Sequence, residues 1–137
     1  MSASVKPGLK EPPTTRELKA ILESDGIKKL VALYTERKAQ DAQPFIQASF
    51  VEISDWLLAR KQYGVAKELC GLFLDSYPNS ARAHYALANV AEQSNDSALA
   101  RNHFMEVLRL LNDDPDLDYR TRKRLEQATG QGLSRLK

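Results

Sequence analysis

The sequence repeats itself at an offset of 34 residues, and this repeat restricts the fold more than any other feature. Small residues recur in the same places, because Ser54 aligns with Ala88 and Ala66 aligns with Ala100. Two antiparallel helices approach closely only where small side chains face each other, so these positions predict helix contacts. Larger residues recur around them: Ile53 with Leu87, Cys70 with Phe104, and Phe73 with Val107.

Turn residues divide the chain at regular intervals, and no segment alternates apolar and polar residues as a half-buried strand would. We therefore expect an all-α protein. Because one hairpin cannot bury its apolar face alone, about three hairpins should stack. The expected hairpins cover about residues 16–43, 45–77 and 80–111, and a capping helix follows at about 117–129, ended by Gly130 and Gly132.

The N-terminal segment differs in composition from the rest. Residues 1–15 hold three of the six prolines and few large apolar side chains, which predicts a flexible linker. Thr14 or Thr15 would cap the first helix. A single helical domain is then expected over residues 16–137.

The first hairpin fits the repeat less well than the other two. A further shift by 34 residues brings Ala20 and Ala32 into line with the small residues of the next hairpin. Leu30 and Tyr34, however, fit the pattern of a second helix better two residues out of that register. A helical pair is expected here, and its register stays open.

The second and third hairpins carry the same motifs. The second hairpin contains Phe50-x-x-Ile53-Ser54-x-x-Leu57, Ala66-x-x-x-Cys70 and Pro78, and the third contains His84-x-x-Leu87-Ala88-x-x-Ala91 and Ala100-x-x-x-Phe104. These motifs resemble the tetratricopeptide repeat. The resemblance implies a right-handed α-α superhelix, a solenoid whose first helices line a concave groove. It also implies a non-catalytic adaptor, a protein–protein interaction module that binds a peptide or helix there.

The resemblance also implies which residues would line the groove. Arg82, Tyr85 and Asn89 lie at i, i+3 and i+7, so one helix face combines a positive charge, a rigid ring and an amide. An ordinary solvated helix face is the alternative interpretation. The implied lining consists of Val51, Asp55, Arg82, Tyr85, Asn89 and Glu92.

A second resemblance leaves another function open. The short leader helix, Asp25-Gly26-Ile27 and Tyr77-Pro78-Asn79-Ser80 are similar to the helical-repeat extension that follows the catalytic domain of some bacterial β-lactamase-like serine hydrolases. That similarity implies a docking or regulatory role and a periplasmic or extracellular location. A complete, free-standing module would instead be expected in the cytoplasm.

The chain offers little chemistry for an enzyme, and we expect no catalytic residue, cofactor or metal site. His84 and His103 do not form a His-Glu-x-x-His motif, and the repeat places His84 at a packing position. Cys70, the only cysteine, falls at an apolar packing position, which predicts a buried thiol. Helix capping and solvation explain the acidic loop residues Asp113, Asp114 and Asp116 better than acid–base catalysis does.

A basic cluster near the C-terminus is a second candidate binding surface. It consists of Arg120, Arg122, Lys123 and Arg124. Such a patch attracts an acidic protein, a phosphate backbone or an anionic membrane. The net charge of only +2 and the lack of a recognised nucleic-acid fold make nucleic acid an unlikely partner. No apolar run is long enough to span a membrane, and self-association stays open.

Overall fold

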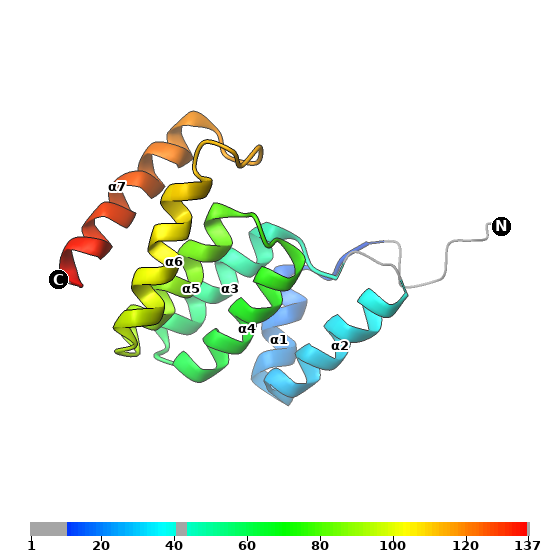
Figure 1. The fold of residues 1–137 in the computed structure, drawn as a ribbon. Coiled ribbons are helices and arrows are strands. Elements are labelled where there is room, and N and C mark those ends of the chain that lie inside the picture. The colour runs from blue at the N-terminus through cyan, green and yellow to red at the C-terminus, as the bar shows by residue number, and fades with distance from the viewer. Residues whose placement is uncertain (1–10, 41–43, 137) are drawn as a thin grey trace. The chain divides into compact units, whose positions relative to one another are not determined.

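The computed structural model describes residues 11–40 and 44–136, and these residues form helices and no strand (Figure 1). The all-α prediction is therefore confirmed. The three predicted hairpins, at about 16–43, 45–77 and 80–111, each correspond to two consecutive observed helices. The helices are α1 (Thr15–Asp25), α2 (Ile27–Ala39), α3 (Gln47–Ala59), α4 (Tyr63–Ser76), α5 (Ala81–Gln93), α6 (Ser97–Leu110) and α7 (Tyr119–Arg135).

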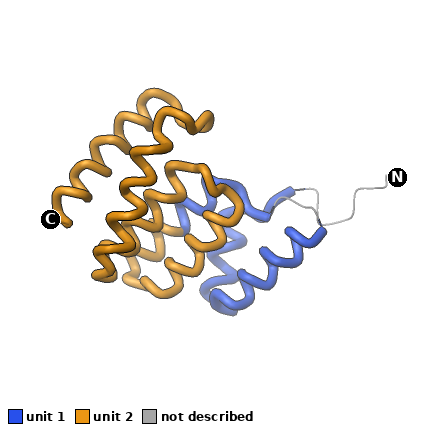
Figure 2. The backbone as a smooth tube through the Cα atoms, viewed as in Figure 1, with its two compact units in different colours: residues 1–53 blue, residues 54–137 orange. Residues whose placement is uncertain are grey.

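The contacts between residues divide the chain into two compact units, residues 1–53 and 54–137, and the division falls inside α3 (Figure 2). In the first unit α1 packs on α2, and in the second unit α4 packs on α5, α5 on α6 and α6 on α7. This sequential antiparallel packing is consistent with a stack of helical hairpins. The single domain predicted over 16–137 stays a prediction, and most of the predicted linker, residues 1–10, lies outside the described residues.

In the first unit, local signals place α1 and α2. Thr14 caps α1 by accepting a hydrogen bond from the backbone N–H of Glu17, whose side chain accepts one from Thr14 N in return. Gly26 ends α1 with a φ of 83°, a conformation that favours glycine. The core of this unit includes three aromatic rings, those of Tyr34, Phe45 and Phe50, with centroids 5.5–6.5 Å apart.

Burial resolves the register that the sequence left open. The buried side chains of α2 are Leu30, Tyr34 and Arg37, whereas Ala20 and Ala32 are exposed. The three buried α2 residues align with buried Ala66, Cys70 and Phe73 of α4 at an offset of 36 residues. This offset is two residues longer than the repeat, so the first hairpin follows the shifted register. Arg37 therefore takes a position that is apolar in the later repeats.

Arg37 can be buried because its guanidinium is satisfied by backbone carbonyls. The residue is 4% exposed, and its side chain donates from Nε to Pro44 O over 3.1 Å and from Nη2 to Glu11 O over 3.1 Å. A buried charge without such partners would be strongly unfavourable. The residue thus connects α2 with chain segments on both sides of the hairpin.

In the second unit the predicted small residues lie where helices meet. Ser54, Ala66, Ala88 and Ala100 are all at most 1% exposed. One core cluster joins Ala88, Ala91 and Ala100 to Phe104, and another surrounds Val107. Buried side chains of α5 and α6 therefore recur at the predicted interval.

The loop before α7 caps α5. Asp114 is 3% exposed, and its carboxylate accepts hydrogen bonds from Ala81 N over 2.8 Å and from Asp116 N over 2.9 Å. Ser80 accepts a third from Ala83 N. Helix capping, which the sequence predicted for this acidic loop, is confirmed at Asp114, because a carboxylate at a helix N-terminus satisfies otherwise unpaired N–H groups.

The turns inside the second and third hairpins each contain one residue in the left-handed conformation. Lys61 has a φ of 59° and Asn95 has a φ of 67°, and they lie 34 residues apart. This left-handed conformation is unfavourable for residues other than glycine, but asparagine tolerates it best. Lys61 is therefore the strained member of the pair.

We predict that Lys61→Gly stabilises the protein by about 0.5–1 kcal/mol, because relief of the strain outweighs the added flexibility of the unfolded chain. Urea unfolding measures the difference. Asn95→Gly is the matched control and should change stability less. A destabilising effect of Lys61→Gly would contradict the assignment of strain to this turn.

The predicted end of the last helix is wrong. Helix α7 continues through Gly130 and Gly132 as far as Arg135. Gly132 is buried, and a Cβ added to it would lie 2.5 Å from Cζ of Phe104, so only glycine fits at this crossing of α6 and α7. Tertiary packing thus overrides the low helix propensity of glycine. Leu133 and Leu136 pack on the same cluster as Phe104.

We predict that Gly132→Ala destabilises the protein by about 1–3 kcal/mol, because the fully buried Phe104 ring has little room to move. Gly130 offers a control in the same helix, since an added Cβ meets nothing within 4 Å. Gly130→Ala should stabilise by about 0.5–1 kcal/mol through helix propensity. Equal effects of the two substitutions on thermal unfolding would refute the role of Gly132.

Candidate interaction surface

The partly exposed residues of α5 form the first candidate surface. Most of this helix is buried, and Arg82, Tyr85, Asn89 and Glu92 are among its partly exposed residues. Their spacing places them along one side of the helix. All four belong to the second unit, and they differ in the side chains that they contact.

Arg82 has an unsatisfied donor. Its Nε is buried and has no hydrogen-bond partner among the described residues. An unpaired buried donor destabilises a protein by about 1–3 kcal/mol. Rotation of the Arg82 side chain toward an added acceptor would relieve this cost.

Tyr85 and Glu92 face neighbouring helices. The Tyr85 ring lies 6.0 Å from the Phe104 ring, tilted by 59°, and packs against both core clusters of the second unit. Glu92 accepts two hydrogen bonds from Arg135, 2.6 Å from its Nε and 2.8 Å from its Nη2. Helices α6 and α7 thus engage two of the predicted lining residues, and Arg82 and Asn89 are the better candidates for contact.

The two α3 residues of the predicted lining fall on different sides of the division between the units. Val51 is half-buried in the first unit, and Asp55 is exposed in the second. Desolvation by neighbouring atoms raises the pKa of the Asp55 carboxyl. The six predicted residues therefore do not belong to one compact unit.

The basic cluster on α7 divides into structural and exposed members. Arg122 donates from Nε to Leu111 O over 3.0 Å and from Nη2 to Leu117 O over 3.2 Å, so it closes the loop after α6. Lys123 lies 3.6 Å from Glu126 and 5.6 Å from the centre of the Tyr119 ring.

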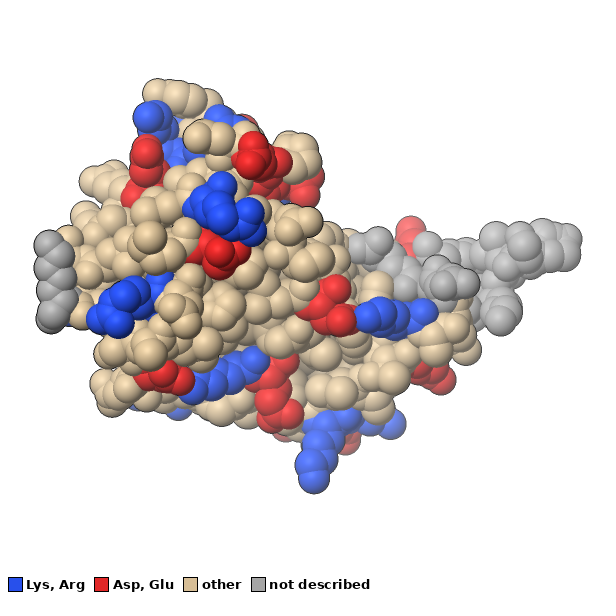
Figure 3. All heavy atoms as spheres, viewed as in Figure 1, with Lys and Arg blue, Asp and Glu red and all other residues tan. Residues whose placement is uncertain are grey.

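Arg120 and Arg124 are exposed members of this cluster. A hydrogen bond from the Thr121 backbone, helped by these two arginines, lowers the pKa of Asp118, the N-cap of α7. On the face shown in Figure 3, Lys and Arg lie interspersed with Asp and Glu. The cluster is thus a weaker binding surface for anions than its four positive charges suggest.

An apolar patch on α6 was missed from the sequence. Met105 is 54% exposed and Leu108 is 37% exposed. Leu108 borders a depression of about 240 Å³ that Arg122, Lys123 and Glu126 also line. The repeat frame could have indicated Met105, because it aligns with exposed Gly71, a position with no side chain to bury.

Both residues that the sequence assigned to packing are buried. His84 is 9% exposed and Cys70 is fully buried. Burial raises the pKa of the Cys70 thiol to about 12, and Ser54 Oγ lies 3.8 Å from its sulfur. Since the thiolate is the reactive form, this thiol is a poor nucleophile.

We predict that Ellman's reagent labels Cys70 in the native protein at least about a hundredfold more slowly than in the protein unfolded by guanidinium chloride, because the buried thiol resists ionisation. The absorbance of the released thionitrobenzoate measures both rates. Labelling at comparable rates would show that Cys70 is accessible.

His84 has a partner that sequence spacing did not reveal. Its Nδ1 lies 2.9 Å from Nδ1 of His103, although the two residues are 19 positions apart. His84 precedes Ser94, the C-cap of α5, by ten residues, and His103 follows it by nine. In a hairpin that folds about this turn, residues at similar distances before and after the turn lie close together. The position of the turn could therefore have indicated the contact between His84 and His103.

The sequence matches no protein-family model, and a search of curated proteins finds no match either. Within the described residues, no three His, Cys, Asp or Glu side chains are grouped so that they could hold a metal ion. None of the helices in this part of the chain is long and apolar enough to cross a membrane.

Proposed function

We propose that this protein is a non-catalytic protein-interaction module whose α5 helix binds an extended segment of a partner through Arg82 and Asn89. The packing of successive antiparallel helices supports a tetratricopeptide-like solenoid, in which the first helix of each hairpin contributes to the binding face. The observation that carries the proposal is the buried, unpaired Nε of Arg82.

The chemistry of the two side chains defines the ligand. Arginine binds carboxylates with paired, charge-assisted hydrogen bonds, and an asparagine amide both donates to and accepts from a peptide backbone. Seven helical residues rise about 10 Å, which equals about three residues of an extended chain. An acidic side chain next to Arg82 and a backbone amide next to Asn89 would thus fit within one short peptide.

The other residues of this face have supporting roles in the proposal. Tyr85, held against Phe104, provides a rigid surface behind the ligand, and Glu92 holds α7 through Arg135. The burial of Cys70 and the packing of His84 support a non-catalytic role, because neither is placed to attack a substrate.

We predict that peptides selected from a random display library by the wild-type protein bind the Arg82→Ala/Asn89→Ala variant at least about tenfold more weakly, as measured by titration calorimetry. The selected peptides should share an acidic residue. Loss of affinity is expected because both hydrogen-bonding groups are removed from the face of α5.

Asn102→Ala/Arg124→Ala is the matched control, since it removes the same side chains at exposed positions on α6 and α7. It should leave affinity unchanged. If the control loses affinity and the α5 variant retains it, the binding surface is the basic cluster on α7 and the proposal is wrong.

A further inference from the structure

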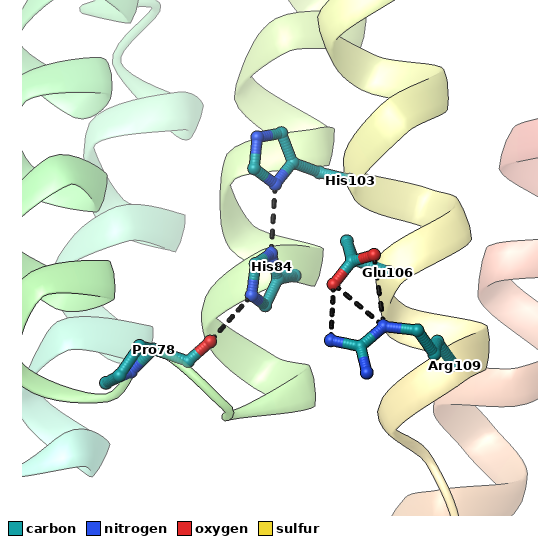
Figure 4. Close-up of polar contacts among 5 residues, drawn as sticks. All are labelled: Pro78, His84, His103, Glu106 and Arg109. Carbon is teal, nitrogen blue, oxygen red and sulfur yellow. Dashed lines mark hydrogen bonds and ion pairs between the residues drawn. The ribbon is translucent and has the colours of Figure 1, made fainter.

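Two histidines link α5, α6 and the turn before α5 (Figure 4). The rings of His84 and His103 stack with centroids 5.1 Å apart and an angle of 22°, and their Nδ1 atoms are 2.9 Å apart. Nε2 of His84 lies 2.9 Å from the carbonyl oxygen of Pro78. His84 is buried and His103 is half-buried, so water has limited access to these contacts.

The Pro78 carbonyl fixes the protonation pattern of the pair. A carbonyl oxygen can only accept a hydrogen bond, so Nε2 of His84 must carry a hydrogen. In neutral His84 the other nitrogen, Nδ1, is then an acceptor. His103 must therefore donate from its Nδ1, which defines the tautomers of both rings at neutral pH.

This arrangement accepts one added proton and not two. The first proton binds Nε2 of His103 and leaves the contact between the two Nδ1 atoms intact. A second proton would have to bind Nδ1 of His84, where it would point at the N–H of His103 across 2.9 Å. Two donors cannot form a hydrogen bond, and two positive rings at this distance repel each other.

Glu106 is the neighbouring charge that opposes this repulsion, because, besides the hydrogen bond from Arg109, the charges of both histidines lower the pKa of its carboxyl. Burial and the charge of His84 lower the pKa of His103, whereas Glu106 on the same helix acts in the opposite direction. Glu106 is bound to Arg109 by hydrogen bonds of 2.8–3.2 Å (Figure 4), so much of its charge is already compensated. At the end of α4, Asp75 and Tyr77 are the titratable residues closest in sequence to Pro78.

We propose that the His84–His103 pair is a proton-sensitive latch, which holds α5, α6 and the Pro78 turn together at neutral pH and opens when both rings are protonated. The latch follows from the geometry of the two imidazole rings and the Pro78 carbonyl. The carbonyl can only accept a hydrogen bond, so it fixes which nitrogen of His84 carries the hydrogen. The latch does not depend on which surface binds a partner.

The sign of the pH effect follows from proton counting. In the unfolded chain both histidines take up a proton near their ordinary pKa of about 6.5, whereas the closed latch accepts one at most. The unfolded state therefore binds more protons in acid. The stabilisation is complete above about pH 6.5 and is lost as the pH falls, by about a tenfold change in the unfolding equilibrium constant per pH unit for each excluded proton.

His103→Asn tests the latch without removing its hydrogen bond. The asparagine amide can donate to neutral His84 and, after rotating, accept from protonated His84. Between about pH 7.5 and about pH 5, the unfolding equilibrium constant of the wild type should rise at least about tenfold more than that of His103→Asn. Glu106→Gln, which leaves the pair intact, should keep the wild-type pH dependence.

Equal pH dependence in the wild type and His103→Asn would overturn the proposal. A second measurement needs no variant: nitrogen-15 NMR of the imidazole rings should show His84 protonated at Nε2 and His103 at Nδ1 at neutral pH. His84 protonated at Nδ1, or both rings titrating in the folded protein without a change in their neighbours, would equally contradict the latch.

Discussion

The second unit depends on the close approach of helices at positions without large side chains. Ala66, Ala88 and Ala100 are fully buried, and Gly132 lies under the Phe104 ring. A larger residue at any of these places would separate two helices and expose the apolar residues around them. What recurs along the second unit is therefore a small side chain at each helix contact. The larger apolar residues of its core pack around these small side chains.

This constraint explains how much of the fold the sequence could predict. Helix bounds follow from local signals such as the Thr14 cap, and the small-residue positions follow from the 34-residue offset. The end of α7 and the first-hairpin register depend instead on tertiary partners. The helix continues through Gly132 because Leu133 and Leu136 pack on the cluster that contains Phe104, and Arg37 fills an apolar position because two carbonyls accept from it. Phe104 and Glu11 both lie more than 20 residues away in sequence from the residues that they contact.

The candidate site was predictable to a smaller extent. The sequence predicted that the candidate residues share one face of α5. It could not show that Tyr85 and Glu92 pack against later helices, because no pattern specifies which faces a capping helix covers. It also assigned His84 to packing and missed its contact with His103. Periodicity identifies the side of a helix on which a residue lies, whereas the neighbour across the interface depends on how the helices cross.

The carboxylate of Asp114 has a consequence for the order of folding. It completes the first turn of α5, yet it lies 33 residues later in the chain, after the whole of α6. During synthesis at about 5–20 residues per second, α5 leaves the ribosome seconds before its cap. Until then its first N–H groups depend on Ser80 and water, so this hairpin should become stable only together with the loop that follows it.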